Sequence, residues 1–437
     1  MFQSKQVDGI RPSKNRLLIV DWASLSYHQL HALNAKAKTS HVVDFNTPED
    51  ELRVWRAGML SKMLRYIKLF NPMDIVLTKE GDNVWRKDFV KEYYSEHAIV
   101  SYNSVGYYVR YDNFLFGLHK DAASGDIIKQ KMHPIKDAAD IPDNGKKLKD
   151  MPQRIQDMCW EIVLPKYKGQ RSKQSWDFLV TRSDWRKYKE DFTHIIGKIF
   201  RAHILGHDEA EGDDAIYVSA NHWEKKYDSI VLITCDGDLT QLKYIEKLMI
   251  FNHRTEEFKE CQNPKTFCEI KILAGDKSDN IMGMALPGKA TQLADKGASN
   301  LFEATSNIYA KSQAEGWDNQ YLRNQRLVDL SYIPTHIQRE LVESLDNSRP
   351  VTCSTEEMQD MGYPDKMIQE INTMKNVGYY TLNTKEYLES YPDLLSVDNS
   401  KQVSTQKDNQ VQQAMATKRS FGDCEGVFND PLDGDIF

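Results

Sequence analysis

Short apolar runs that end in an acidic residue recur along this chain, with helix-like segments between them. The runs RLLIVDWAS at 16–24, DIVLTKEGD at 74–82 and SIVLITCDGDLTQL at 229–242 combine β-branched residues with acids near their ends. Runs of this length and composition are typical of strands buried in a parallel sheet. The segment ELRVWRAGMLSKMLRYIKLF at 51–70 spaces its apolar residues as an amphipathic helix does. Strands that alternate with helices predict an α/β fold with a mainly parallel central sheet flanked by helices.

The chain of 437 residues is long enough for more than one domain. We expect an α/β core over 1–270. Within it, an insertion over about 90–160 reads as a β-hairpin followed by an irregular basic loop, and an arch region covers about 161–200. Residues 271–395 have a helical pattern, and 396–437 are rich in Ser, Gln, Asn and Asp. The sequence therefore predicts a helical C-terminal region and a disordered acidic tail.

No part of the chain reads as a membrane segment or a secretion signal. There is no apolar run of about 18 residues, and the N-terminal segment MFQSKQVDGIRPSKNR is polar. The 6 cysteines form no CxxC pair, which is typical of reduced thiols. These features predict a cytoplasmic protein without a membrane partner.

Acidic residues follow each predicted strand, and a later turn adds more. The carboxyl ends of parallel strands meet at one edge of a sheet, where open α/β sheets bind their ligands. Carboxylates crowded together repel one another, and Mg²⁺ offsets this repulsion because it prefers carboxylate and water oxygens. No His or Cys accompanies these acids at ligand spacing, which disfavours zinc. The candidate metal ligands are Asp21, Glu80, Glu211, Asp213, Asp214, Asp236, Asp238, Asp276 and Asp279.

Each of these acids also has a purely structural interpretation. A single Asp after a strand is commonly the N-cap of the next helix, and Asp236 fits that role. Asp213 and Asp214 would favour the start of a helix through the helix dipole. The recurrence of acids after several strands favours a metal-binding cleft over independent caps. Two ions about 4 Å apart in such a cleft would suit phosphodiester hydrolysis.

Several motifs together resemble a known family. They are LIVDWAS, NVWRKDF, YKGQRSKQSWDF, EGDD, CDGDLTQL and GDKSDNIMGM, in this order over roughly 16–90 and 160–350. They resemble the 5′-nucleases of the flap endonuclease superfamily, and in particular the ribonuclease H group of T-even phages. The resemblance implies a PIN-like 5′-nuclease fold with a helical arch and a helix–three-turn–helix motif at about 273–303. It also implies a metal-dependent 5′→3′ exonuclease and flap endonuclease that removes RNA primers and flaps during DNA replication.

The resemblance divides the acidic residues between two Mg²⁺ ions, for which we expect Mn²⁺ to substitute. Asp238, Asp276 and Asp279 would lie on the side of the second ion, and the other six acids would surround the first. The family usually has Asp where this chain has Glu80, which leaves Asp82 as an alternative ligand.

Two basic residues match cations that the family places at the base of the arch. Arg86 lies in NVWRKDF and Lys168 in YKGQRSKQSWDF. They would neutralise the scissile phosphate and the charge that develops in the transition state. The alternative for each is an ordinary solvated surface charge. The expected catalytic residues are Asp21, Arg86, Lys168 and Asp236.

A basic stretch and a glycine-rich turn are the candidate DNA-binding segments. Residues 166–189 interleave basic residues, among them Arg171 and Lys173, with aromatic ones, which suits a threaded single strand. The alternative is an exposed helix with an aromatic core stripe. In GDKSDNIMGMALPGKA the glycines let backbone amides approach duplex phosphates, and the resemblance implies a K⁺ ion there. The residues at this turn are Gly283, Gly288 and Lys289.

The expected partners are DNA with 5′ flaps or ends and RNA–DNA hybrids, in the host-cell cytoplasm if a phage encodes the chain. The net charge of −7 does not argue against DNA, because acids and bases concentrate in different segments. The tail FNDPLDGDIF is similar to peptides that dock on sliding clamps and to the tips of single-strand-binding proteins, although a solvated end explains it equally. The alternatives for the whole chain are a PIN-class nuclease with other nucleic-acid substrates and a catalytically silent DNA-binding scaffold.

Overall fold

The computed structural model describes residues 15–39, 46–120, 126–132, 144–169, 176–283 and 318–350, with single positions left out, and parts of 353–372. Its central element is a 6-stranded sheet in the order β11-β10-β9-β1-β2-β8. Every neighbouring pair in it is parallel except β10 with β11. The predicted α/β class with a mainly parallel sheet is thus confirmed. The strands are β1 (Arg16–Val20), β2 (Asp74–Thr78), β8 (His203–Leu205), β9 (Ser229–Ile233), β10 (Leu248–Asn252) and β11 (Glu257–Lys259).

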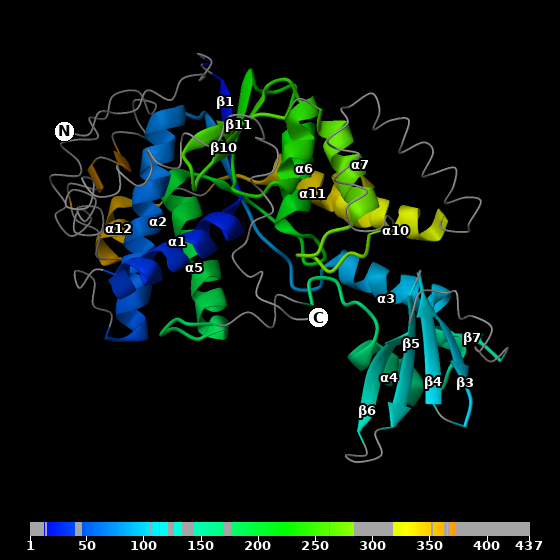
Figure 1. Cartoon of the computed structure of the whole chain (residues 1–437). Helices are drawn as coiled ribbons and strands as arrows, with labels where there is room; N and C mark the ends of the chain where they lie inside the picture. The colour runs from blue at the N-terminus through cyan, green and yellow to red at the C-terminus, as the bar shows by residue number, and fades with distance from the viewer. Residues whose placement is uncertain are drawn as a thin grey trace, which may run out of the picture.

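Side chains of the sheet alternate between two hydrophobic cores, as strand geometry requires. Leu18 and Val20 of β1 pack with the helices on one face, whereas Leu17 and Ile19 pack with those on the other. Figure 1 shows the two sets of helices on either side of the sheet. The first set is α1 (Trp22–Thr39), α2 (Pro48–Phe70) and α5 (Arg182–Phe200), and the second includes α6 (Gly212–His222) and α11 (Thr335–Asn347).

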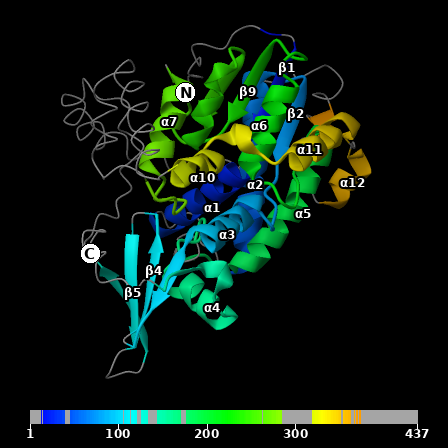
Figure 2. The same cartoon turned by 90° about the vertical axis from the view of Figure 1, so that its right-hand side faces the viewer.

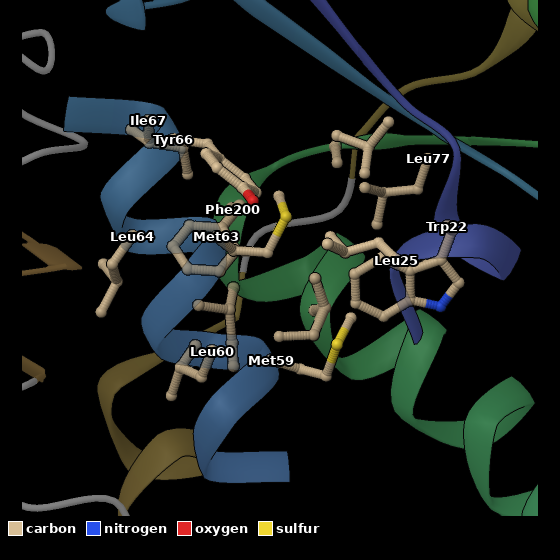
Figure 3. Close-up of a cluster of buried hydrophobic side chains, with 14 of the residues drawn as sticks. Trp22, Leu25, Met59, Leu60, Met63, Leu64, Tyr66, Ile67, Leu77 and Phe200 are labelled. Atoms are coloured by element: carbon tan, nitrogen blue, oxygen red, sulfur yellow. The ribbon is translucent and has the colours of Figure 1, made fainter. Parts of the chain in front are cut away.

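The core on the α2 side holds the junction between β1 and α1. Met59 and Met63 of α2 point toward Trp22 and Leu25 of α1, and all of them are buried (Figure 3). Full burial of one such side chain stabilises the fold by roughly 1.5–3 kcal/mol. The junction that this core fixes is occupied by Asp21, one of the candidate metal ligands.

The remaining helices lie outside these two sets, and α4 lies with the second sheet (Figure 1). Among the described helices, none is both long and apolar enough to cross a membrane. They are α3 (Trp85–His97), α4 (Gln153–Ile162), α7 (Pro264–Ala274), α10 (Asp318–Val328) and α12 (Thr355–Asp360), with short 3₁₀ turns η2 (Leu148–Asp150), η4 (Asp238–Tyr244) and η5 (Leu330–Tyr332).

A second, antiparallel sheet is formed within the insertion, in the order β6-β5-β4-β3-β7. Figures 1 and 2 show it with α4 at one end of the molecule, beside α3. The expectation of one hairpin followed by an irregular loop is therefore wrong. β6 carries Lys at alternate positions and β7 has 2 residues, so neither shows the apolar alternation that marks a strand. The strands are β3 (Ile99–Tyr102), β4 (Gly106–Tyr111), β5 (Phe114–Lys120), β6 (Ile127–Met132) and β7 (Lys146–Lys147).

A buried ion pair ties this second sheet to the C-terminal helices. Arg323 of α10 contacts Asp112 Oδ2 at 2.5 Å through Nη1, which also donates to the Tyr94 hydroxyl at 2.7 Å. Its Nη2 donates to the Met282 carbonyl at 3.1 Å. One guanidinium thus joins the insertion to the turn that contains Asp276, another candidate metal ligand.

The start of α5 offers a test of local architecture. Thr181 Oγ1 accepts a hydrogen bond from the Asp184 backbone amide at 3.1 Å and so caps the helix. We expect Thr181→Ala to lower the free energy of unfolding in urea by about 1 kcal/mol, the usual cost of losing such a cap. Thr181→Ser keeps the acceptor oxygen and is expected to stay close to wild type. Equal loss in both variants would contradict the capping role.

Candidate active site

The turns that follow β1, β2 and β9 lie at the same edge of the central sheet. β1 pairs in parallel with β2 on one side and β9 on the other, and the Asp21 amide donates to the Ile233 carbonyl at 3.0 Å. This register brings the turns that carry Asp21, Glu80 and Asp236 to one edge of the sheet. Asp213, in the first turn of α6, joins them, because the charges of Asp21 and Asp236 act on it. We call Asp21, Glu80, Asp213 and Asp236 the acidic cluster.

Asp21 is held in a fixed orientation although its environment disfavours its charge. It is 5% exposed and accepts hydrogen bonds from Thr234 Oγ1 at 2.7 Å and the Ser24 amide at 3.1 Å. Burial raises the pKa of Asp21 to about 7, and the negative charges of Asp236 and Glu80 add to this, while the two hydrogen bonds oppose it.

The pKa of Asp213 is raised even more strongly than that of Asp21. Burial and the charges of Asp236 and Asp21 raise its pKa well above the usual range, and the Lys168 ammonium only partly opposes them. The acidic cluster therefore carries more negative charge than its protein neighbours compensate.

Glu80 belongs to this cluster, whereas the alternative Asp82 lies outside it. The negative charge of Glu80 is the smallest of the causes that raise the pKa of Asp21. Glu80 and Asp82 are both exposed, and the Asp82 carbonyl accepts a hydrogen bond from Lys87 Nζ at 3.3 Å in the turn before α3. These contacts favour Glu80 over Asp82 as the acid of the β2 turn.

Arg86 lies beneath the first turn of α6 rather than at the surface. Its side chain is 1% exposed and contacts Glu211 Oε2 at 3.0 Å and Asp214 Oδ1 at 2.8 Å. The other oxygen of Asp214 accepts hydrogen bonds from Trp85 Nε1 at 3.1 Å and from the Glu211 amide at 3.0 Å. The sequence led us to expect a phosphate contact for Arg86 and a metal-ligand role for Asp214. Because both are buried and engaged with each other, the structure supports a positioning role for them instead.

Glu211 is positioned from both sides by cations. Lys168 Nζ contacts Glu211 Oε1 at 2.5 Å and Asp279 Oδ2 at 3.8 Å, and the Tyr167 hydroxyl donates to Glu211 Oε2 at 2.9 Å. Burial works to raise the pKa of Glu211, but Lys168 and Arg86 outweigh it and hold that pKa at about 2. Glu211 is thus an ionised carboxylate with a fixed direction.

The remaining acids form a separate group around Lys271 of α7. Its ammonium contacts Asp238 Oδ1 and, at 2.7 Å, Asp276 Oδ2. Asp276 Oδ1 also accepts hydrogen bonds from the amide and hydroxyl of Ser278 at 2.8 and 2.6 Å. Burial raises the pKa of Asp238 to about 6, although Lys271 opposes it. Asp276 is therefore compensated by protein contacts, in contrast to Asp21 and Asp213.

Sequence reasoning did not assign Lys271 to this site, and it placed Tyr167 and Lys189 only within the basic stretch 166–189. The sequence could have indicated the role of Lys271. A lysine within the apolar helical run CEIKILAG is expected to be partly buried and therefore to need an acidic partner. Nothing in RSDWRKYKED distinguishes Lys189 from the exposed basic residues around it.

The acidic cluster fits a hard divalent cation by its donor chemistry. In the described part of the chain, no group of three or more His, Cys, Asp or Glu is already arranged to hold a metal ion. The donors of the cluster are carboxylates alone, and the raised pKa values of Asp21 and Asp213 show a charge imbalance that a cation would remove.

Most of the predicted DNA-binding residues lie outside the described residues. These are Arg171, Lys173, Gly288 and Lys289, together with 284–303 of the expected helix–three-turn–helix motif and the tail 396–437. Gly283 is described, and a Cβ atom there would lie 2.1 Å from the Ala274 carbonyl oxygen. The structure therefore explains this glycine by its close approach to the end of α7.

The chain is similar in sequence to a phage nuclease. No family model matches it. It is 25% identical over 174 residues to the ribonuclease H of Enterobacteria phage T4, a match that covers 36% of this chain and 57% of that protein. The matched part thus spans little more than half of that relative's length. This similarity confirms the resemblance to the 5′-nuclease superfamily that the motifs indicate.

Two solved structures of phage T5 proteins also align with the chain. The D15 protein co-crystallized with metal ions has a TM-score of 0.43 at 14% identity, over 76% of this chain and 99% of that one. A 5′-exonuclease with bound zinc has a TM-score of 0.41 at 14% identity, again over 76% and 99%.

Proposed function

We propose that this chain is a divalent-metal-dependent 5′-nuclease that hydrolyses phosphodiester bonds at 5′ ends and flaps of DNA and in RNA–DNA hybrids. The observation that carries the proposal is the acidic cluster at the carboxyl edge of the parallel sheet, whose negative charge its protein neighbours leave uncompensated. The similarity to a ribonuclease H supports the reaction class. Removal of primers and flaps during replication is the role that fits these substrates.

The residues that would hold the metal are Asp21, Glu80, Asp213 and Asp236, with Glu211 beside them. Mg²⁺ bound there would supply an activated water and a Lewis acid for the leaving oxygen. Arg86 and Asp214 would keep Glu211 in place through their buried contacts. Asp238 and Asp276, which share Lys271, are the candidates for a second, weaker position.

Lys168 would bind the phosphate that is cut. Its ammonium already lies between Glu211 and Asp279, at the border of the two acidic groups. A cation at this place can stabilise negative charge that develops on the phosphate. The residues around 275–300 would bind the duplex, and the 5′ end would pass toward the arch region.

Lys168→Ala is expected to slow the chemical step more than it weakens binding. We expect kcat to fall by about 10²-fold because the stabilised charge develops only in the transition state. Single-turnover cleavage and equilibrium binding of a flap duplex measure the two effects separately. Lys225→Ala is the control, since Lys225 is exposed after the end of α6 and lies outside the candidate DNA-binding segments. A loss of affinity without a loss of rate would make Lys168 a simple phosphate anchor.

The proposed function is tested with a 5′-labelled flap duplex incubated with the protein in Mg²⁺ or in EDTA. We expect cleavage near the flap junction in Mg²⁺ only, and its loss in Asp21→Ala. Asp228→Ala is the control, because Asp228 is an exposed acid before β9, at the opposite edge of the same sheet. Binding without cleavage by the wild type would favour a silent DNA-binding scaffold. Cleavage of RNA in preference to every flap substrate would favour a PIN-class nuclease.

A further inference from the structure

The hairpin of β10 and β11 lies beside β9, whose following turn carries Asp236, and β11 is the outermost strand of the sheet. β10 pairs in parallel with β9, and the Thr234 amide donates to the Phe251 carbonyl at 3.0 Å, so the two strands end at the same level. His253 directly follows β10, and Lys259 is the last residue of β11. The proposed function uses neither residue, although both contact the turns of the acidic cluster or their neighbours.

Lys259 holds the backbone of the turn that carries Asp236. Its Nζ donates to the Cys235 carbonyl at 2.9 Å and to the Asp236 carbonyl at 3.1 Å. These carbonyls belong to the peptide groups on either side of the Asp236 Cα atom, so one ammonium restrains the backbone from which the carboxylate projects. The Asp236 amide is held as well, because it donates to Thr234 Oγ1 at 2.9 Å.

His253 reaches the first turn of α1, which follows Asp21. Its side chain is 3% exposed, and its Nε2 lies 3.1 Å from Ser24 Oγ. The same hydroxyl lies 3.1 Å from the Sγ atom of Cys235, the residue before Asp236. The Ser24 amide donates to Asp21 Oδ1 at 3.1 Å. The Ser24 hydroxyl therefore joins the end of β10 and the turn after β9 to the start of α1.

The two hairpin residues differ in what their charge can contribute. Burial lowers the pKa of His253 to about 3, and the positive charges of His28 and Lys62 add to this, so the imidazole is neutral at neutral pH. His253 therefore acts through its hydrogen bond and its packing. A Lys259 ammonium repels a divalent cation at the acidic cluster. Lysine at this position thus favours such an ion only through the backbone that it holds.

We propose that Lys259 and His253 are positioning residues that set the spacing between two carboxylates of the acidic cluster for a divalent metal ion. The inference rests on the proposed function, because that ion would bind at the cluster. The two carboxylates, Asp21 and Asp236, follow different strands. Parallel pairing brings their turns to one edge without fixing the distance between the side chains. Partners that orient metal ligands in this way typically change metal affinity by about 10–100-fold when they are removed.

The first measurement is the affinity of the free protein for Mn²⁺, from the electron paramagnetic resonance signal of unbound Mn²⁺ without nucleic acid. We expect Lys259→Met to weaken Mn²⁺ binding by about 10-fold. If Lys259 contributed only its charge, the same variant would bind Mn²⁺ more tightly, because a repelling charge is gone. Unchanged or tighter binding therefore overturns the role of Lys259. Lys259→Arg keeps donors for the two carbonyls and should bind as the wild type does, as should the control Lys265→Met at an exposed position.

The second measurement tests the contact between His253 and Ser24 without a change of charge. We expect His253→Phe and Ser24→Ala each to weaken Mn²⁺ binding by about 10-fold. The double variant should lose no more than either single one, because the two substitutions remove the same hydrogen bond. His253→Gln, which keeps an amide nitrogen for Ser24, should recover most of the affinity. Additive losses, or no loss in His253→Phe, would overturn the role of His253.

Failure of this inference is distinguishable from failure of the proposed nuclease. If the wild type binds Mn²⁺ and cleaves a flap duplex, while Lys259→Met and His253→Phe bind Mn²⁺ equally well, only the positioning role is rejected. If these variants lose Mn²⁺ affinity but the wild type cleaves no substrate, the nuclease is rejected and the positioning role stands. Thermal unfolding checks the fold, and a loss of affinity that follows Tm in every variant, Lys265→Met included, would overturn the inference as well.

Discussion

Asp236→Asn is expected to remove cleavage and to leave duplex binding in place. Asn has nearly the shape of Asp, and its Oδ1 can still accept the hydrogen bond that Asp236 Oδ1 accepts from the Asp238 amide at 2.8 Å. The local turn should therefore persist. The substitution removes one negative charge from the acidic cluster, on which the affinity for a divalent cation depends. We expect kcat/KM on a 5′-flap duplex to fall by at least about 10³-fold.

The control for Asp236→Asn is Asp228→Asn, at the opposite end of β9. Both substitutions make the same change of charge, but Asp228 is exposed and distant from the cluster along the strand. Asp228→Asn should cut as the wild type does, and both variants should bind the duplex in EDTA. Wild-type cleavage by Asp236→Asn would remove Asp236 from the set of metal ligands.

Arg86→Met is expected to have the largest effect on stability. Met has a long apolar side chain that can fill much of the space left by Arg, but it leaves the carboxylates of Glu211 and Asp214 without their buried cation. Removing one partner of a buried ion pair typically costs about 3–5 kcal/mol. We expect the free energy of unfolding in urea to fall by about that amount. Lys87→Met, at the exposed next position, should change it little.

A double substitution tests whether the loss arises from unpaired charge. Asp214→Asn removes one of the two carboxylates that Arg86 compensates, while the amide oxygen can still accept the Trp85 hydrogen bond. The destabilisation of the double variant should therefore be smaller than the sum of the two single effects. Additive effects would show that Arg86 stabilises the fold through packing alone.

Much of the core could be predicted from the sequence because its signals are local. RLLIV and SIVLI are apolar after their first residue, which is typical of strands buried on both faces, and β1 and β9 are fully buried in the structure. Asp21 follows β1 directly and Asp236 is the third residue after β9, and parallel order alone then places both turns at one edge. The second sheet lacked such signals, since β6 carries lysines and β7 is very short.

The partners of the charged residues could not be predicted, because each contact joins segments far apart in the chain. Arg86 and Lys168 looked alike as candidate phosphate ligands. In the structure Arg86 is buried under Glu211 and Asp214, whereas Lys168 remains partly accessible between Glu211 and Asp279. The positioning role of Arg86 and the phosphate-binding role proposed for Lys168 thus differ by burial and by the carboxylates that each contacts. Neither property can be read from the spacing of residues along the chain.

The sequence by itself determined the class of fold and the edge of the sheet at which the acids meet. It could do so because hydrophobic periodicity and the position of an acid after a strand are properties of neighbouring residues. Only the tertiary structure decided which carboxylates are compensated and which are not. Lys271 neutralises Asp276 and Arg86 neutralises Asp214, while burial and the neighbouring negative charges disfavour the ionised forms of Asp21 and Asp213. Those differences arise from distance and burial in three dimensions, which set the strength of each electrostatic interaction.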